Sequence, residues 1–164
     1  MKPKVYLETT IVSYLTAWPS RDLVMAANQV STRQWWETAK GRFELYISQP
    51  VVDEARAGDP DAAERRPDEL QGIPQLATTQ EANILAKALL KEVPWPPKAQ
   101  TDALHIALAA VHGMNYLVSW NCTHIANATL RLRIEAVCRA AGYEPPIICT
   151  PQELQQLTEV DEDA

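Results

Sequence analysis

Four side chains that offer oxygen ligands stand where they could act together: Glu8, Glu54, Asp102 and Asn121. Each lies just after a strand-like segment or near the start of a helical one. Three carboxylates that lie close together stay ionised only when a cation neutralises them. Mg²⁺ prefers oxygen ligands, uses few carboxylates and keeps several waters. Because such an ion polarises a phosphoryl oxygen and lowers the pKa of an attacking water, these residues indicate phosphodiester hydrolysis.

Each of these residues also has an interpretation that involves no chemistry. Glu8 could be a strand-end acid favoured by a helix dipole, and Glu54 an exposed helix residue. Asp102 could be a first-turn acid after the cap Thr101, and Asn121 a turn residue. Asp102, however, introduces an otherwise apolar helix. A charge at such a border needs a partner, which favours a site.

The segments that must position these residues alternate between short apolar runs and helical patterns. We expect strands at 4–8, 43–47, 76–77, 115–119 and 146–149. We expect helices from Thr9, with Thr9 and Thr10 as caps, then over 22–40, 51–58, 59–70, 79–92, 100–112 and 125–141, and from Pro151. The alternation predicts the α/β class, as a single-domain α/β/α sandwich with a mostly parallel central sheet. Ligands of such sheets bind beyond the carboxyl ends of the strands.

The composition is that of one globular domain. The chain has 164 residues, of which 46% are hydrophobic and 22% are charged, so we expect one domain over 1–158. Its 15 basic and 21 acidic residues give a formal charge of −6. Four of the acids lie in the last six residues, and we expect 159–164 to be a disordered acidic tail. The nearly neutral remainder excludes a large, non-specific basic binder of nucleic acid.

Several other classes of protein are disfavoured by the same sequence. No apolar run reaches the roughly 18 residues that a membrane span needs, so we expect no membrane partner. The first residues contain no apolar signal segment, which predicts a cytoplasmic protein. Cys122, Cys138 and Cys149 are widely spaced and form no CxxC pair. Free thiols are therefore favoured over a disulfide framework or a structural zinc site.

Three segments of the chain together resemble a known family. They are VYLETTIVSYL at 5–15, ISQPVVDEA at 47–55 and TDALHIALAAVHGMNYLVSWNCTHIAN at 101–127. In order and spacing they resemble PIN-domain proteins, the nuclease fold of VapC-type toxins in bacterial toxin–antitoxin pairs. The resemblance spans residues 4 to about 150, which is essentially the whole expected domain.

The resemblance implies a function and a set of site residues. Glu8, Glu54 and Asp102 match the family's acids, Asn121 matches its fourth acidic or amide position, and Thr9 matches a supporting hydroxyl. The family is implied to be a Mg²⁺- or Mn²⁺-dependent endoribonuclease, often a homodimer and often held inactive by an antitoxin protein. Two departures stand out: Glu8 is one methylene longer than the usual Asp, and Asn121 carries no charge.

Three further residues are candidates for contact with an RNA substrate. His124 follows Asn121 by three residues. Trp18 could stack a base, as aromatic side chains do in single-strand recognition, although packing in the core is the commoner role. Arg21 could attract phosphates, although most such arginines are solvated surface charges.

Other histidines and tryptophans favour structural roles. We interpret His105 as a near-surface polar residue and His112 as a helix C-terminal residue favoured by the dipole, rather than as metal ligands. Trp35 and Trp36 are adjacent, so we expect one to pack inside and the other to form a partner surface. Trp95, in a Pro-rich connector, is another candidate for a partner surface.

Two alternatives to a nuclease stay open. One is a non-catalytic interaction module on the same fold, motivated by the departures at Glu8 and Asn121. The other is a different Mg²⁺-dependent phosphotransfer enzyme. It ranks last, because the chain has neither a DxDxT nucleophile motif nor a GxxxxGK[ST] loop.

Overall fold

The computed structural model describes residues 1–63 and 70–155. The predicted tail at 159–164 and half of the predicted helix at 59–70, namely 64–69, lie outside these residues. The labelled α-helices are α1 (Thr9–Thr16), α2 (Leu23–Arg42), α3 (Gln49–Gly58), α4 (Gln80–Glu92), α5 (Gln100–Val111) and α6 (Arg131–Ala140). Residues 151–155 are helical as well, as predicted. The strands are β1 (Lys4–Leu7), β2 (Glu44–Ser48), β3 (Gln75–Leu76), β4 (Tyr116–Val118) and β5 (Ile147–Cys149). Short 3-10 helices occupy Pro60–Ala63 and Pro97–Ala99.

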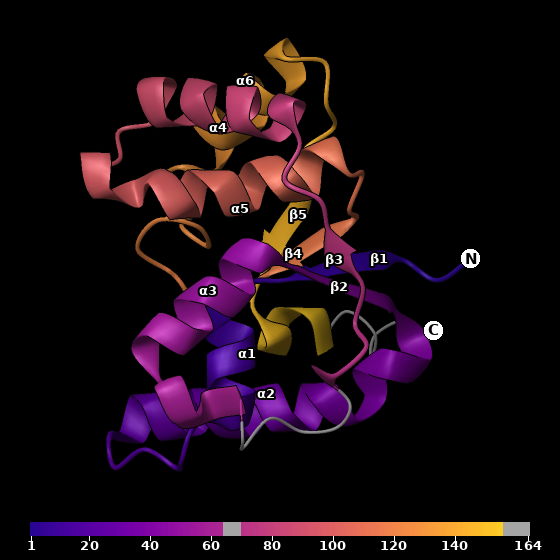
Figure 1. The fold of residues 1–164 in the computed structure, drawn as a ribbon, viewed down its shortest axis with the longest axis vertical. Coiled ribbons are helices and arrows are strands. Elements are labelled where there is room, and N and C mark those ends of the chain that lie inside the picture. Colours follow the sequence, from indigo (N-terminus) through magenta and orange to yellow (C-terminus); the bar gives the residue numbers. More distant parts are fainter. Residues whose placement is uncertain (64–69, 156–164) are drawn as a thin grey trace.

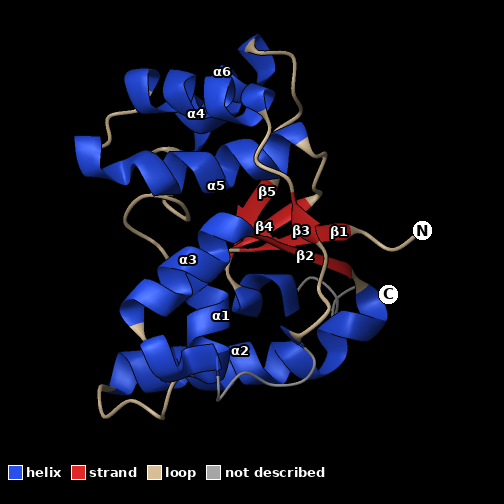
Figure 2. Ribbon diagram, in the orientation of Figure 1, coloured by secondary structure: helices blue, strands red, loops and turns tan. Residues whose placement is uncertain are grey.

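The five strands of the described residues form one sheet in the order β3-β2-β1-β4-β5. Every pairing is parallel, and Val5 in the central strand lies opposite Leu45 on one side and Tyr116 on the other. Helices α1 to α3 cover one face of the sheet and α4 to α6 cover the other (Figure 1). Figure 2 shows the strands enclosed between these two helical layers. The predicted single-domain α/β/α sandwich is therefore confirmed.

The strand order has a switch point between β1 and β4. From β1 the chain moves outward to β2 and β3, and it then returns across the sheet to place β4 on the other side of β1. The loops that leave the carboxyl ends of these two strands therefore diverge. Open parallel sheets bind ligands at such points. Glu8 follows β1 directly, and Ser119 follows β4.

The central strands and α5 form the core. Val5, Tyr6 and Leu7 are all buried, as expected for a parallel strand covered by helices on both faces. Helix α5 is 12 residues long and buries most of its side chains. No helix in the described ranges is both long and apolar enough to cross a bilayer.

Two helix starts differ from the prediction, and in both cases a side chain explains why. Thr9 and Thr10 do not cap α1: Thr9 is already helical, and the Glu8 carboxylate accepts the backbone N–H of Thr10 as the N-cap. The helix predicted at 125–141 begins only at Arg131. In the preceding loop, Asn121 and Asn127 accept backbone N–H groups with their side chains, which competes with helix formation.

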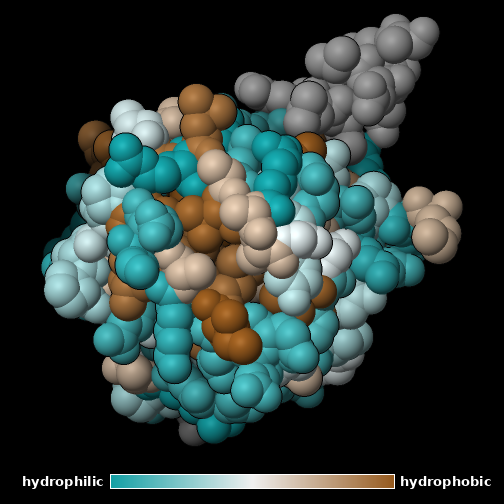
Figure 3. Space-filling model, turned by 90° about the horizontal axis from the view of Figure 1, so that it is seen from above, coloured by the Kyte–Doolittle hydropathy of each residue, from teal (hydrophilic) through white to brown (hydrophobic). Residues whose placement is uncertain are grey.

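The outer face of α4 and α6 carries an apolar groove. Its volume is about 650 Å³, and alanines line most of it: Ala88, Ala136, Ala140 and Ala141. Ile84 on α4 and Leu132 on α6 are also exposed. Figure 3 views this face, and apolar residues gather across its middle. Glu92 and Arg133 give the groove one charge of each sign.

Replacement of Asp22, the N-cap of α2, should lower the stability of the protein by a small but measurable amount. The Asp22 carboxylate accepts the backbone N–H of Met25 at 2.8 Å. We expect Asp22→Ala to lower the free energy of unfolding by about 1 kcal/mol, because a helix donor loses its acceptor. Urea denaturation measures this. The control is Glu37→Ala, which removes an exposed charge from the same helix and should change the free energy of unfolding by less than about 0.5 kcal/mol. Equal effects of Asp22→Ala and Glu37→Ala would contradict the capping role of Asp22.

Candidate functional site

Glu8 is a buried carboxylate at the carboxyl end of β1. Its side chain is held by one oxygen, Oε2, which accepts from Thr10 N at 3.0 Å, Thr10 Oγ1 at 2.6 Å and Ser119 Oγ at 2.8 Å. The residue is only 3% exposed. Oε1 accepts no hydrogen bond from residues 1–63 or 70–155. One oxygen is thus fixed by three donors, and the other is available to a ligand.

Glu54, in the middle of α3, is anchored in the same way. Its Oε1 accepts from Thr9 Oγ1 at 2.6 Å and lies 2.5 Å from His105 Nε2. Oε2 has no hydrogen-bond partner among the described residues. Burial alone would raise the pKa of Glu54, but the hydrogen bonds from His105 and Thr9, together with the histidine's charge, outweigh it and lower the pKa. Glu54 is therefore a carboxylate at neutral pH.

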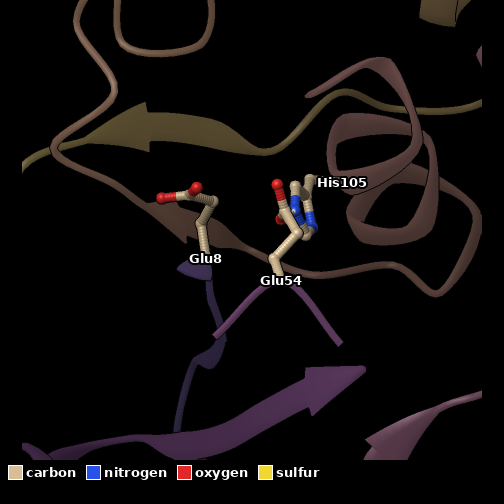
Figure 4. Close-up of side chains that lie close together, drawn as sticks. All are labelled: Glu8, Glu54 and His105. Carbon is tan, nitrogen blue, oxygen red and sulfur yellow. Dashed lines mark hydrogen bonds and ion pairs between the residues drawn. The ribbon is translucent and has the colours of Figure 1, made fainter. Parts of the chain in front are cut away.

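Glu8, Glu54 and His105 form a compact group, here called the carboxylate cluster. One ligand atom from each lies within 4.8 Å of the others. Figure 4 shows the Glu54 carboxylate beside the His105 ring, with Glu8 across from them. The sequence prediction that Glu8 and Glu54 converge is confirmed.

The interpretation of His105 as a near-surface residue is wrong. His105 is 0% exposed, and both of its ring nitrogens have partners: Tyr6 Oη lies 2.7 Å from Nδ1 and Glu54 lies beside Nε2. Its burial follows from its position on α5, a helix whose side chains are mostly buried. His112, by contrast, caps the C-terminus of α5 as predicted, with Nε2 2.8 Å from the carbonyl oxygen of Ala77.

Asp102 belongs to a second group, here called the Asp102 cluster, with Asn121 and His124. Its Oδ1 accepts from Asn121 Nδ2 at 3.1 Å, and its Oδ2 lies 2.7 Å from His124 Nδ1. Asn121 Oδ1 in turn accepts the backbone N–H of His124 at 3.1 Å. These are the partners that a charge at the start of an apolar helix requires. Asp102 is not among the ligand atoms of the carboxylate cluster.

Ser119 joins the two clusters. Its hydroxyl donates to Glu8 Oε2 and accepts the backbone N–H of Asn121 at 2.9 Å. Asp102 and His105 are also three residues apart on α5, so they lie on the same side of that helix. All four predicted site residues therefore surround the carboxyl ends of β1 and β4. Ser119 was missed by the sequence reasoning, although a hydroxyl directly after a central strand is a usable signal.

The predicted substrate contacts fall in two places. His124 lies within the Asp102 cluster. Trp18 and Arg21 follow the C-terminal end of α1, whereas Glu8 caps its N-terminal end. An eight-residue helix, about 12 Å long, therefore separates them from the carboxylates. These two residues are not brought to the site.

The tryptophans proposed for partner surfaces are buried instead. Trp35 and Trp36 both pack in the core, with Trp35 against Phe43. The prediction that one of them forms a surface is wrong, because both side chains are buried, Trp35 at 1% and Trp36 at 8% exposure. Trp95 is also buried and donates its indole N–H to the carbonyl oxygen of His124 at 2.9 Å. It therefore supports the loop that carries the Asp102 cluster.

The donor set of the carboxylate cluster fits a hard divalent cation. One carboxylate oxygen of Glu8 and one of Glu54 lie within 4.8 Å of each other, and each of the two residues has one oxygen without a protein donor among the described residues. Two oxygens on opposite sides of a Mg²⁺ ion are about 4.2 Å apart, which is within the 4.8 Å limit that holds for these ligand atoms. No Lys or Arg in the described part of the chain forms an ion pair with these acids or with Asp102. Glu54 and Asp102 each lie beside a histidine, whereas Glu8 has no cationic partner among the described residues, so its negative charge is left for a bound cation to neutralise.

Acid should destabilise the parent more than a Glu54→Gln variant. A folded-state pKa below the ordinary 4.5 means that the unfolded chain binds the proton more readily. The stabilisation from Glu54 is therefore present above about pH 4.5 and is lost as the pH falls through the lower folded pKa. Urea denaturation between pH 6 and pH 3 measures this. We expect the free energy of unfolding to fall less steeply with pH for Glu54→Gln than for the parent, and to fall as in the parent for Asp53→Asn, which removes a neighbouring exposed acid. If the parent and Glu54→Gln lose stability in parallel, the lowered pKa of Glu54 is contradicted.

Comparisons with known proteins add no relative to this picture. No model of a known protein family matches the chain, and a search of curated proteins finds no significant match. The residues and their geometry therefore carry the functional assignment.

Proposed function

We propose that the chain is a Mg²⁺- or Mn²⁺-dependent endoribonuclease that hydrolyses RNA phosphodiester bonds. The observation that carries this proposal is the pair of anchored carboxylates, Glu8 and Glu54, at the switch point of a parallel sheet. Each presents one oxygen without a protein donor in the described residues. That arrangement suits an oxygen-seeking metal better than it suits fold stability, since two neighbouring acids repel each other.

Each residue has a role in this proposal. Glu8 and Glu54 hold the cation, and Asp102 supplies the third negative charge beside them. A bound Mg²⁺ or Mn²⁺ would polarise a phosphoryl oxygen and lower the pKa of the attacking water. Thr9 and Ser119 fix the carboxylates through the hydrogen bonds described above. Asn121 and His124 face the substrate from the same edge of the sheet, held in place by Asp102.

RNA as the substrate, and the wider context, follow from the resemblance to PIN-domain proteins. On that basis the chain is the cytoplasmic toxin of a toxin–antitoxin pair, with a cognate antitoxin protein as its partner. We also expect a homodimer, and the apolar groove between α4 and α6 supports a protein partner on that face. Light scattering measures the oligomeric state. Trp18, which is 73% exposed, and Arg21 would contact only an RNA long enough to extend past α1.

Cleavage of a labelled pool of single-stranded RNA tests the proposal. We expect cutting with Mg²⁺ or Mn²⁺ that stops when EDTA is added. A preparation of Glu54→Gln, purified in parallel, controls for contaminating nucleases. Absence of cutting by folded protein free of its partner, at every metal concentration tried, would contradict the proposal.

A second candidate, a non-catalytic interaction module, is favoured by one observation. Both carboxylate oxygens of Asp102 are engaged by Asn121 and His124, so Asp102 must give up a partner to bind a metal. The two candidates differ in metal binding. The module predicts no saturable calorimetric heat and no thermal stabilisation with Mg²⁺ or Mn²⁺, whereas the nuclease predicts both.

A further inference from the structure

A chain of buried hydrogen bonds runs from the core of the sheet to Glu54. Ser48 Oγ lies 2.6 Å from Tyr6 Oη, which lies 2.7 Å from His105 Nδ1. His105 Nε2 then lies 2.5 Å from Glu54 Oε1. Tyr6, Ser48 and His105 are all buried. The chain formed by these three buried polar side chains thus ends at one oxygen of Glu54, a proposed metal ligand.

We propose that His105 positions the Glu54 carboxylate for the metal ion and does not itself bind that ion. The inference rests on the proposed function, because it assigns a role within the proposed metal site. It assigns a functional role to His105, whereas the local sequence pattern favours a purely structural one.

The placement of protons supports this role. The ionised carboxylate of Glu54 can only accept hydrogen bonds, so His105 Nε2 must carry a proton and donate it. A nitrogen that donates a hydrogen bond has no lone pair left for a metal. The other ring nitrogen, Nδ1, is 2.7 Å from the Tyr6 hydroxyl inside the core. Neither nitrogen is therefore open to an ion, although Nε2 lies within 4.8 Å of ligand oxygens.

The elements that carry the chain show why the ring is held so firmly. Tyr6 lies on β1, Ser48 ends β2, and His105 lies on α5. Ser48 Oγ also accepts the backbone N–H of Val51 and so caps α3, the helix that carries Glu54. The histidine is therefore fixed against both the sheet and the start of the helix whose carboxylate it orients.

The consequence for Glu54 is that its two oxygens are unequal. Oε1 is held by two donors, His105 and Thr9 Oγ1. Oε2, with no donor in the described ranges, is left for the cation. Hydrogen-bond partners of this kind commonly change metal affinity by about 10- to 100-fold.

Mn²⁺ binding to four variants tests the inference. Calorimetry gives the affinity, and circular dichroism confirms folding. We expect His105→Leu to weaken Mn²⁺ binding about 10- to 100-fold. His105→Gln should recover most of the affinity, because its amide nitrogen can reach Glu54 as Nε2 does. Thr9→Val, which removes the second donor, should also weaken binding, whereas the matched control Thr16→Val, at the far end of α1, should not.

Spectroscopy of the bound ion separates positioning from direct ligation. Pulsed electron paramagnetic resonance of Mn²⁺ on the parent should show no directly bound nitrogen. A coupling typical of a bound imidazole that disappears in His105→Gln would overturn the inference. Parent-like affinity in folded His105→Leu would overturn it too. If His105→Leu fails to fold, the inference is tested with His105→Gln and Thr9→Val instead. It is then overturned if Thr9→Val binds Mn²⁺ with the affinity of the parent and the parent shows a nitrogen bound to Mn²⁺.

The same experiment distinguishes this inference from the proposed function. If the parent binds no Mn²⁺, the proposed metal site itself is wrong and the inference falls with it. If the parent binds Mn²⁺ and Glu54→Gln abolishes binding while His105→Leu leaves it unchanged, the proposed metal site stands and only the role of His105 is wrong.

Discussion

Glu8→Gln is expected to lower metal-dependent RNA cleavage at least about 100-fold while the protein stays folded. The hydrogen-bond donors determine how the new amide sits. Thr10 and Ser119 present three donors to one side of the Glu8 carboxylate, so the amide oxygen must take that side. The amide nitrogen then occupies the position open to the metal, and an amide nitrogen carries no lone pair for it. Since even outer partners of a ligand change metal affinity by about 10- to 100-fold, loss of a ligand should cost more.

Two measurements check this result. Initial rates of cleavage give the loss of activity, and melting temperatures with and without Mg²⁺ report binding. We expect Mg²⁺ to stabilise the parent and not Glu8→Gln. The matched control is Asp53→Asn, which removes an exposed acid next to Glu54 and should behave as the parent. Parent-like cleavage by Glu8→Gln would show that Glu8 is no ligand.

Asp102→Ala is expected to reduce cleavage by about 100-fold or more, in the range found when one preorganised polar group is removed from an active site. The substitution removes a negative charge from the site. It also leaves Asn121 Nδ2 and His124 Nδ1 without the acceptor that orients them. Both effects act where the substrate phosphate would lie. Initial rates at saturating metal measure the loss.

A first-turn acid that served only the helix dipole would behave differently. Its removal would cost at most about 1 kcal/mol of stability and would leave cleavage unchanged. Glu81→Ala provides that comparison, because Glu81 is the exposed first-turn acid of α4. If Asp102→Ala cuts RNA as fast as Glu81→Ala does, the assignment of Asp102 to the site is wrong.

The fold was predictable because its signals are local. The apolar runs that become β1 and β4 are short and alternate with helical patterns, which is typical of parallel α/β sheets. The predicted start of α6 is too early in the chain. Asn121 and Asn127 in the preceding loop form side-chain hydrogen bonds to the backbone, and the spacing of hydrophobic residues does not reveal such bonds.

The site was predictable only in part. The carboxyl ends of parallel strands meet at one edge, which brings Glu8 and Glu54 together without any knowledge of side chains. The hydrogen bonds that orient them join distant positions: Tyr6 and His105 are 99 residues apart, and Glu8 and Ser119 are 111 apart. No local pattern encodes such pairs. His105 was therefore interpreted as a near-surface residue, and Ser119 was not considered.

The chemical form of the cut RNA ends tests the central claim, a metal-dependent hydrolytic centre, most directly. Single-stranded RNA is cut with Mn²⁺ in water enriched in oxygen-18, and the product ends are identified by mass spectrometry. The account predicts one oxygen-18 atom in each new terminal phosphate, no 2′,3′-cyclic phosphate, no products in EDTA, and at least about 100-fold less product with Glu8→Gln. Cyclic phosphate ends, which report attack by the ribose 2′-hydroxyl, or cutting that persists in EDTA, would contradict it.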